Sequence, residues 1–160
     1  MTIKVGDKIP DVSLRTMVEG KPTPITTTEL TTGKKVALFG VPGAFTPTCS
    51  AKHLPGFKEK VADFRSKGFD TIACVSVNDA FVMAAWGKDQ RVGEDIVMLA
   101  DGNADLAKAL GLEMDGTGIG FGPRIKRFSM VLDNGVVKQL NVEEAGKFEV
   151  SSAEFMLGQL

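Results

Sequence analysis

Three short apolar runs, each ending in turn or polar residues, divide the chain at 35–41, 71–77 and 96–100. Runs of this length that are rich in Val, Ile, Leu and Phe predict strands buried on both faces. The first of them ends at Pro42-Gly43, which indicates an exit loop. We therefore expect these runs to form the centre of a sheet.

Helix-like segments follow each of these runs. The pattern predicts helical structure over 47–67, interrupted near Pro55-Gly56 because proline removes a helical hydrogen bond. A second helix is expected over 80–88, with Asp79 as its N-cap. A third, shorter helix begins at Asn103 or Asp105 and is stopped by Gly111.

The remaining chain has weaker patterns. Residues 1–34 predict short strands and loops, and the glycine-rich stretch 114–122 predicts a loop. The stretches 127–132 and 136–142 flank Asn134-Gly135, a strong hairpin signal.

The last segment has a helix start at Ser151-Ser152 and predicts a helix that ends at Leu160. Strands that alternate with helices and end in a hairpin indicate an α/β fold with a central mixed β-sheet flanked by helices. A chain of 160 residues without a linker or repeat fits a single domain over 1–160.

Composition narrows the class of protein further. The hydrophobic fraction of 43% and the charged fraction of 24% are typical of globular proteins. A net charge of −1 gives no field that attracts nucleic acid or an anionic membrane. Neither a signal peptide nor an apolar run of about 20 residues is present. We expect a cytoplasmic protein without membrane or nucleic-acid partners.

Few residues are suited to metal or nucleotide binding. The chain has two cysteines, Cys49 and Cys74, and one histidine, His53. This set is too small for a disulfide framework or for a metal site built from several Cys and His ligands. The glycines of 116–122 lack the strand, helix and lysine context of a nucleotide loop. No metal or cofactor is expected.

The segment around Cys49 holds the main candidate for chemistry. Thr46-Pro47 fits an N-cap followed by proline at the first helical position, which places Cys49 third in the helix. There its sulfur faces free N–H groups and the positive end of the helix dipole, and both favour thiolate.

The helix dipole contributes only about 0.3–1 kcal/mol, which is too little to ionise a thiol fully at neutral pH. A reactive cysteine at this position therefore needs a cation or further hydrogen bonds. The sequence offers five candidates for that role: Lys52, His53, Arg124, Lys126 and Arg127. A buried, inert cysteine is the alternative interpretation.

Pro42 and Thr46-Pro47-Thr48-Cys49 match P-x-x-x-T-x-x-C, the signature of peroxiredoxins. The longer string 40–50 resembles their type II branch. Further similar strings lie at 53–57, 74–79, 81–86 and 126–131. The resemblance covers essentially the whole chain and implies a thioredoxin-like fold.

The resemblance also implies an activity, the reduction of hydrogen peroxide and alkyl hydroperoxides in antioxidant defence and redox homeostasis. Cys49 matches the cysteine that becomes a sulfenic acid, and Thr46 matches the hydroxyl that binds sulfur and peroxide. Arg127 matches the arginine that holds the thiolate and polarises the peroxide. Pro42 matches the residue that shields the pocket.

The return of the sulfenic acid to thiol has two possible routes. Cys74 is either a buried strand cysteine or a resolving thiol, and the residues alone leave both open. Because no cysteine occurs over 147–152, where some animal relatives carry a resolving one, we favour an external thiol. The expected reductant is glutaredoxin with glutathione, or thioredoxin. The resemblance also implies a homodimer.

Three other functions are compatible with parts of this pattern. The first is a thioredoxin-fold binding or chaperone module with an inert Cys49. A disulfide reductase is disfavoured because position 46 is Thr, which leaves no C-x-x-C. A cysteine hydrolase built on Cys49 and His53 is disfavoured because the histidine would need its own orienting acid and no acyl-transfer signature is present. For His53 we expect packing or a hydrogen bond to the Cys49 loop.

Overall fold

The computed structural model describes residues 2–160, and seven strands in it form one mixed sheet in the order β2-β1-β5-β4-β3-β8-β9. Their bounds are β1 (Ser13–Val18), β2 (Lys21–Thr26), β3 (Lys35–Gly40), β4 (Thr71–Ser76), β5 (Val97–Ala100), β8 (Phe128–Asp133) and β9 (Val136–Val142). The two remaining strands, β6 (Glu113–Asp115) and β7 (Pro123–Ile125), pair with each other outside this sheet.

The three apolar runs form the centre of the sheet, as the sequence predicts. β3 pairs in parallel with β4, and β4 in parallel with β5. β8 and β9 add the predicted hairpin, with positive φ at Asn134 and Gly135. A second antiparallel hairpin, β1–β2, forms the opposite edge of the sheet, where β1 pairs with β5. The mixed sheet of the predicted α/β class is therefore present, with antiparallel strands at both edges.

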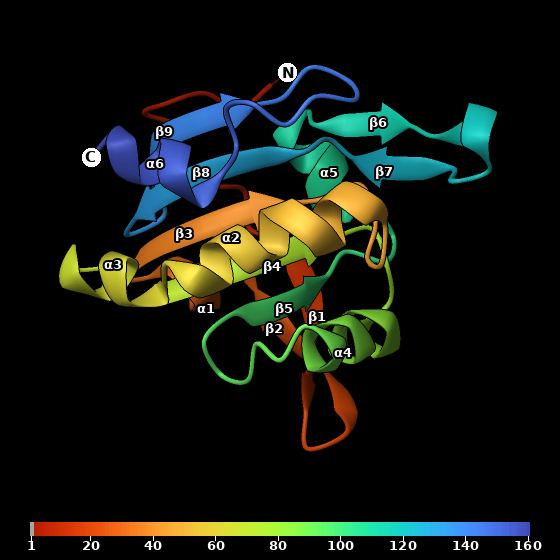
Figure 1. Ribbon diagram of the computed structural model, residues 1–160, viewed down its shortest axis with the longest axis horizontal. Helices are drawn as coiled ribbons and strands as arrows, with labels where there is room; N and C mark the ends of the chain where they lie inside the picture. Colours follow the sequence, from red (N-terminus) through yellow and green to blue (C-terminus); the bar gives the residue numbers. More distant parts are fainter. Residues whose placement is uncertain (1) are drawn as a thin grey trace.

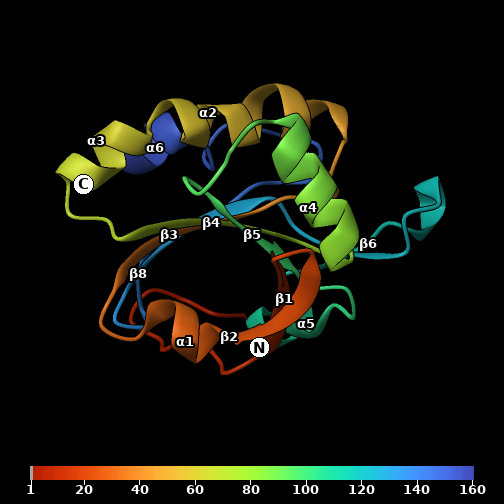
Figure 2. The same cartoon turned by 90° about the horizontal axis from the view of Figure 1, so that it is seen from below.

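Helices cover both faces of the sheet (Figures 1 and 2). Their bounds are α1 (Thr27–Thr31), η1 (a π-helix, Cys49–His53), α2 (Leu54–Glu59), α3 (Val61–Ser66), α4 (Ala80–Asp89), α5 (Asp105–Leu110), η2 (a 3-10 helix, Thr117–Ile119) and α6 (Ala153–Gly158). Side chains of α2, α3, α4 and α6 pack in one apolar core. Side chains of α1 and α5 pack in a second core on the other face. Cys49 belongs to the first core.

The helical segment after β3 differs from the prediction. Helical structure begins at Pro47 as expected, but it runs through Pro55 and is interrupted at Lys60 instead. The N–H of Leu54 donates to the carbonyl of Cys49, five residues back, so the helix widens before the proline. Pro55 follows as the second residue of α2, where the continuous helical segment lacks one backbone N–H donor.

Two further expectations need correction. The stretch 114–122, predicted as a loop, lies mostly within a hairpin of β6 and β7 connected by η2. Within 1–34, which predicts only strands and loops, Thr26 and Glu29 form a reciprocal capping box that starts α1. The pattern T-x-x-E was the available signal for this helix.

Gly40 ends β3 where the chain turns toward Cys49, and the Phe128 ring of β8 lies against it. A methyl group at this position would overlap the ring, which is itself fully buried. We expect Gly40→Ala to lower the free energy of unfolding by about 1–3 kcal/mol because a packed core resists added volume. Denaturant titration measures this change.

The matched control is Gly56→Ala. Gly56 lies in α2 with no atom near the position of an added methyl group. This variant is expected to keep or raise stability, by up to about 1 kcal/mol, because alanine favours helix. Equal effects of the two substitutions would contradict a packing role for Gly40.

Candidate active site

Cys49 lies at the carboxyl end of the central parallel strands. β3 ends at Gly40, residues 41–46 form a loop, and the helical segment then carries Cys49 back over the sheet (Figure 1). The Cys49 side chain is completely buried. Ligands of open α/β sheets commonly bind at this edge, where the strands end.

Arg127 meets Cys49 because of strand pairing. In the antiparallel register of β3 and β8, Gly40 pairs with Phe128, so Arg127 lies beside the end of β3. Its Nη2 donates to the Cys49 sulfur at 3.0 Å, and its Nη1 donates to His53 Nδ1 at 2.9 Å. The arginine thus contacts two residues of η1 at once.

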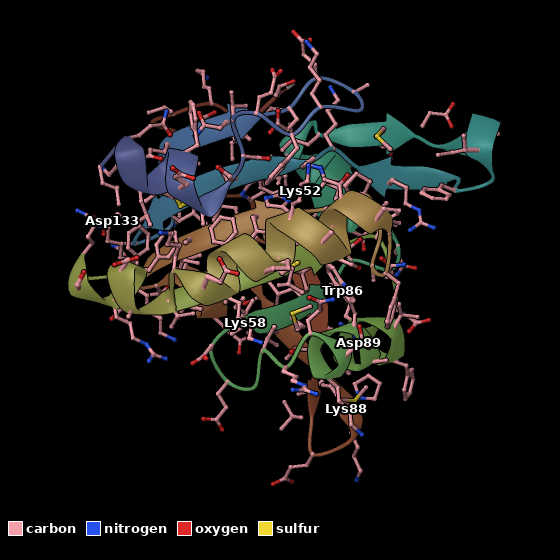
Figure 3. The ribbon with its side chains drawn as sticks, in the orientation of Figure 1. Lys52, Lys58, Trp86, Lys88, Asp89 and Asp133 are labelled. Atoms are coloured by element: carbon pink, nitrogen blue, oxygen red, sulfur yellow. The ribbon has the colours of Figure 1, made fainter. Side chains whose placement is uncertain are left out.

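The four other candidate cations make different contacts. Arg124 donates to the carbonyls of Phe121 and Pro42. Lys126 and Lys52 are exposed, and Lys52 is labelled on the helical segment in Figure 3. Hydrogen bonding to the sulfur therefore distinguishes Arg127 within this set.

His53 is neutral at physiological pH. Its pKa is lowered from 6.5 to about 3, chiefly by burial and also by the nearby Arg127 guanidinium, while a hydrogen bond to the Ser151 carbonyl acts in the opposite direction. Its Nε2 lies 2.8 Å from that carbonyl oxygen. The expected packing of His53 is present, against Phe39 and Phe148. Its side-chain hydrogen bonds go to Arg127 and Ser151 rather than to the Cys49 loop.

The low pKa of His53 makes stability depend on pH. Above pH 6.5 the residue is neutral in both states and has no effect. Between pH 6.5 and about 3 the unfolded chain binds a proton that the folded chain does not, so the free energy of unfolding falls as pH falls. We expect the wild type to lose about 3 kcal/mol more than His53→Gln between neutral pH and about pH 4. Denaturant titration at both values measures the difference, and equal losses would contradict it.

Thr46 lies at the predicted helix start, but its side chain acts outside the helix. Its carbonyl accepts from the N–H of Ser50, while its hydroxyl donates to the Gly43 carbonyl at 2.7 Å. Among the residues that the structure describes, it makes no hydrogen bond to the Cys49 sulfur. Because the single hydroxyl proton is used, the oxygen is left as an acceptor.

Pro42 lies in the same loop as Thr46 and helps to line an open cavity of about 610 Å³. Thr48, adjacent to Cys49, and Arg127, which binds the sulfur, also line it, so the cavity ends close to the thiol. Apolar side chains of Met114, Ile119 and Phe121 form part of its wall. The cavity can receive a molecule larger than water.

Cys74 lies on β4 in the same apolar core as Cys49 and is completely buried. Burial raises the pKa of its thiol well above the ordinary value, the neighbouring Cys49 raises it further, and Arg127 acts in the opposite direction. The side chain is therefore a protonated thiol, the poorly nucleophilic form. Both cysteines are free in the structure.

Several side chains that support the site have no recognisable signal in the sequence. Trp86 of α4, labelled in Figure 3, donates its indole N–H to Ser50 Oγ at 3.0 Å. Glu143 and Ser151 come from the segment between β9 and α6, which has no motif. Only an apolar helix pattern around Trp86 was visible in the sequence.

Over residues 2–160, no group of three or more His, Cys, Asp and Glu side chains is arranged to hold a metal ion. Over the same part of the chain, no helix combines the length and the apolar character needed to cross a membrane.

The mixed sheet with helices on both faces has a thioredoxin-like fold, and an arginine bound to a buried cysteine at its edge is an arrangement suited to thiol chemistry. Comparison with known proteins gives the family. The redoxin family matches residues 4–157. The chain belongs to this family, among the peroxiredoxins, and is a thiol peroxidase.

Three similar proteins illustrate the likeness. Peroxiredoxin-2E-2, chloroplastic, of Oryza sativa subsp. japonica is 54% identical over 99% of this chain and 73% of its own length. Peroxiredoxin-2B of Arabidopsis thaliana is 48% identical over 99% of this chain and 98% of its own. A crystal structure titled as reduced Prx3 from Vibrio vulnificus in complex with H2O2 has a TM-score of 0.95 and 51% identity, and 99% of each chain is covered. The predicted resemblance to peroxiredoxins is confirmed.

Proposed function

We propose that Cys49 is the nucleophile that reduces hydrogen peroxide and alkyl hydroperoxides. The observation that carries this assignment is the 3.0 Å hydrogen bond from Arg127 Nη2 to the Cys49 sulfur. A guanidinium at this distance stabilises thiolate over thiol and supplies the cation that a helix start alone lacks. The crystal structure of the reduced Vibrio vulnificus relative in complex with H2O2 supports a peroxide as substrate.

In the reaction, a sulfur lone pair of Cys49 forms a bond to one peroxide oxygen as the O–O bond breaks. The bonding electrons leave on the second oxygen, which takes a proton and departs as water or alcohol. Arg127 stabilises the negative charge that develops on the oxygens. Thr46 Oγ1, whose proton is used by the Gly43 carbonyl, accepts the O–H of the incoming hydroperoxide. Pro42 covers the pocket from the loop side.

Oxidation leaves a sulfenic acid on Cys49, and an external thiol completes the cycle. Attack by this thiol gives a mixed disulfide and water, and a second thiol then releases Cys49. We propose glutaredoxin with glutathione, or thioredoxin, as the reductant. Cys74 is accessory at most, because a fully buried thiol with a raised pKa is a poor nucleophile.

Peroxide consumption with each reductant tests this cycle. Purified protein is assayed with glutathione plus glutaredoxin, and separately with thioredoxin plus its reductase. We expect turnover with at least one system, and we expect Cys74→Ser to support it at a rate within about threefold of wild type. Loss of turnover in a correctly folded Cys74→Ser variant would make Cys74 a resolving thiol and overturn the external route.

We further propose that residues 1–160 form one redoxin domain that acts as a cytoplasmic homodimer. The family resemblance and three exposed apolar side chains, Phe45, Phe81 and Ile119, support the dimer. Size-exclusion chromatography with light scattering distinguishes it from a monomer.

A further inference from the structure

We propose that His53 and Glu143 are positioning residues that hold the Arg127 guanidinium on the Cys49 sulfur through a closed ring of hydrogen bonds. The ring runs from Arg127 through His53 and Ser151 to Glu143 and returns to Arg127. This inference rests on the proposed role of Cys49, and it concerns side chains that the proposed chemistry does not use.

The first half of the ring fixes the plane of the guanidinium. Arg127 Nη1 donates to His53 Nδ1 at 2.9 Å, and Nη2 donates to Cys49 at 3.0 Å. Because a guanidinium is a rigid planar fork, anchoring Nη1 also sets the direction of Nη2. An arginine side chain can only donate, so His53 Nδ1 must accept the hydrogen bond from Nη1. The single proton of the neutral imidazole must therefore lie on Nε2. That proton is donated to the Ser151 carbonyl at 2.8 Å.

The second half of the ring fixes the Ser151 carbonyl. One oxygen of the Glu143 carboxylate, Oε2, accepts four hydrogen bonds at 2.7–2.9 Å, three from the backbone N–H groups of 149–151 and one from the Ser151 hydroxyl. Burial alone would raise the pKa of the Glu143 carboxyl, but the Ser151 hydroxyl and these N–H groups outweigh it and lower the pKa. The backbone N–H of Glu143 donates to the Arg127 carbonyl at 2.9 Å, which closes the ring.

The hydrogen bonds around His53 and Ser151 are shielded from water, whereas Arg127 and Glu143 border the open cavity. His53 and Ser151 are completely buried, and Glu143 is 7% exposed. The Phe148 ring lies 5.1 Å from the imidazole centroid and 5.8 Å from the guanidinium carbon. In Figure 1 the segment between β9 and α6 follows the side of the sheet where α2 lies. Buried hydrogen bonds are not exchanged for bonds to water, so the arrangement stays ordered before a peroxide arrives.

A matched pair of variants separates positioning from packing. An Asn side chain places its amide oxygen near the position of Nδ1 and can still accept from Arg127. A Gln side chain places its amide nitrogen near the position of Nε2 and can still donate to Ser151, but it leaves Arg127 Nη1 without its acceptor. Both remove the aromatic ring, so lost packing affects both.

The main readout is alkylation of Cys49 by iodoacetamide as a function of pH, measured by mass spectrometry, together with the rate of oxidation by hydrogen peroxide. We expect His53→Gln to oxidise about 10 to 100 times more slowly than wild type and its alkylation profile to move to higher pH. His53→Asn keeps the acceptor for Arg127 Nη1 but breaks the link to Ser151, so it is expected to oxidise about 3 to 10 times more slowly than wild type, with a smaller shift of the profile than His53→Gln. Glu143→Gln, which replaces the charged acceptor of the 149–151 segment by a weaker neutral one, is expected to change in the same direction as His53→Gln but less.

The proposal is overturned if His53→Gln keeps the wild-type oxidation rate and alkylation profile. It is also overturned if the Asn and Gln variants lose oxidation rate equally, because His53 would then be a packing residue only. If either His53 variant fails to fold, Glu143→Gln decides, and an unmoved profile there overturns the proposal. Alkylation requires no peroxide. A wild type that alkylates normally but resists peroxide would therefore refute the proposed function without affecting the test of the ring.

Discussion

Replacing Cys49 by serine is expected to abolish peroxide consumption, to the level of the assay without protein. The hydroxyl of serine is not ionised at neutral pH, and a sulfenic acid cannot form on oxygen. Because Cys49 is buried, the smaller and more polar serine also changes the core, so the fold of the variant must be checked by circular dichroism.

Cys74→Ser is the matched control, since Cys74 is an equally buried cysteine in the same core. The two substitutions introduce the same hydroxyl into a similar environment. Loss of activity in Cys49→Ser alone therefore reports chemistry rather than stability. Residual turnover in Cys49→Ser above the background would contradict the assignment of the nucleophile.

Substitution of Arg127 is expected to have the second-largest effect. We expect Arg127→Lys to lower kcat/KM for hydrogen peroxide by about 100-fold or more, even though the positive charge remains. A lysine ammonium cannot hold the Cys49 sulfur and His53 Nδ1 together in one plane, and it lacks the fork that can also reach a peroxide oxygen. Stopped-flow kinetics with varied peroxide concentration measures the change.

Lys52→Gln provides a control for loss of a nearby positive charge. Lys52 lies in η1 beside the site but is exposed (Figure 3), so its charge is screened by water. This variant is expected to remain within about twofold of wild type. Two results would contradict this account: a similar loss of kcat/KM in both variants, or a kcat/KM of Arg127→Lys within threefold of wild type. Either would show that local positive charge suffices and that the hydrogen-bond geometry of Arg127 does not matter.

The elements that the sequence predicts well are those with local signals. The apolar runs of β3, β4 and β5, the Asn134-Gly135 turn and the Asp79 cap each depend on a few neighbouring residues. The π-helix was not predicted, because it depends on how the segment after β3 is held by its neighbours. Trp86, which binds Ser50, is one such neighbour and lies 36 positions away.

The candidate site shows the same division. Cys49 and Thr46 lie in one motif and could be found together. Arg127 was one of five possible cations until the family resemblance selected it, because a contact over 78 positions leaves no periodic pattern. His53 and Glu143 meet only through the segment that ends at Ser151, and no local motif indicates such a ring. Pairing of β8 with β3 places Arg127 beside the end of β3, and pairing of β8 with β9 places Glu143 beside Arg127.

The most direct test of the central claim is to identify the product on Cys49. Reduced wild-type protein is treated with one equivalent of hydrogen peroxide in the presence of dimedone, digested and analysed by mass spectrometry. The expected result is a dimedone adduct on Cys49, formed from its sulfenic acid, with Cys74 unmodified. An unmodified Cys49, or an adduct on Cys74 alone, would contradict the account.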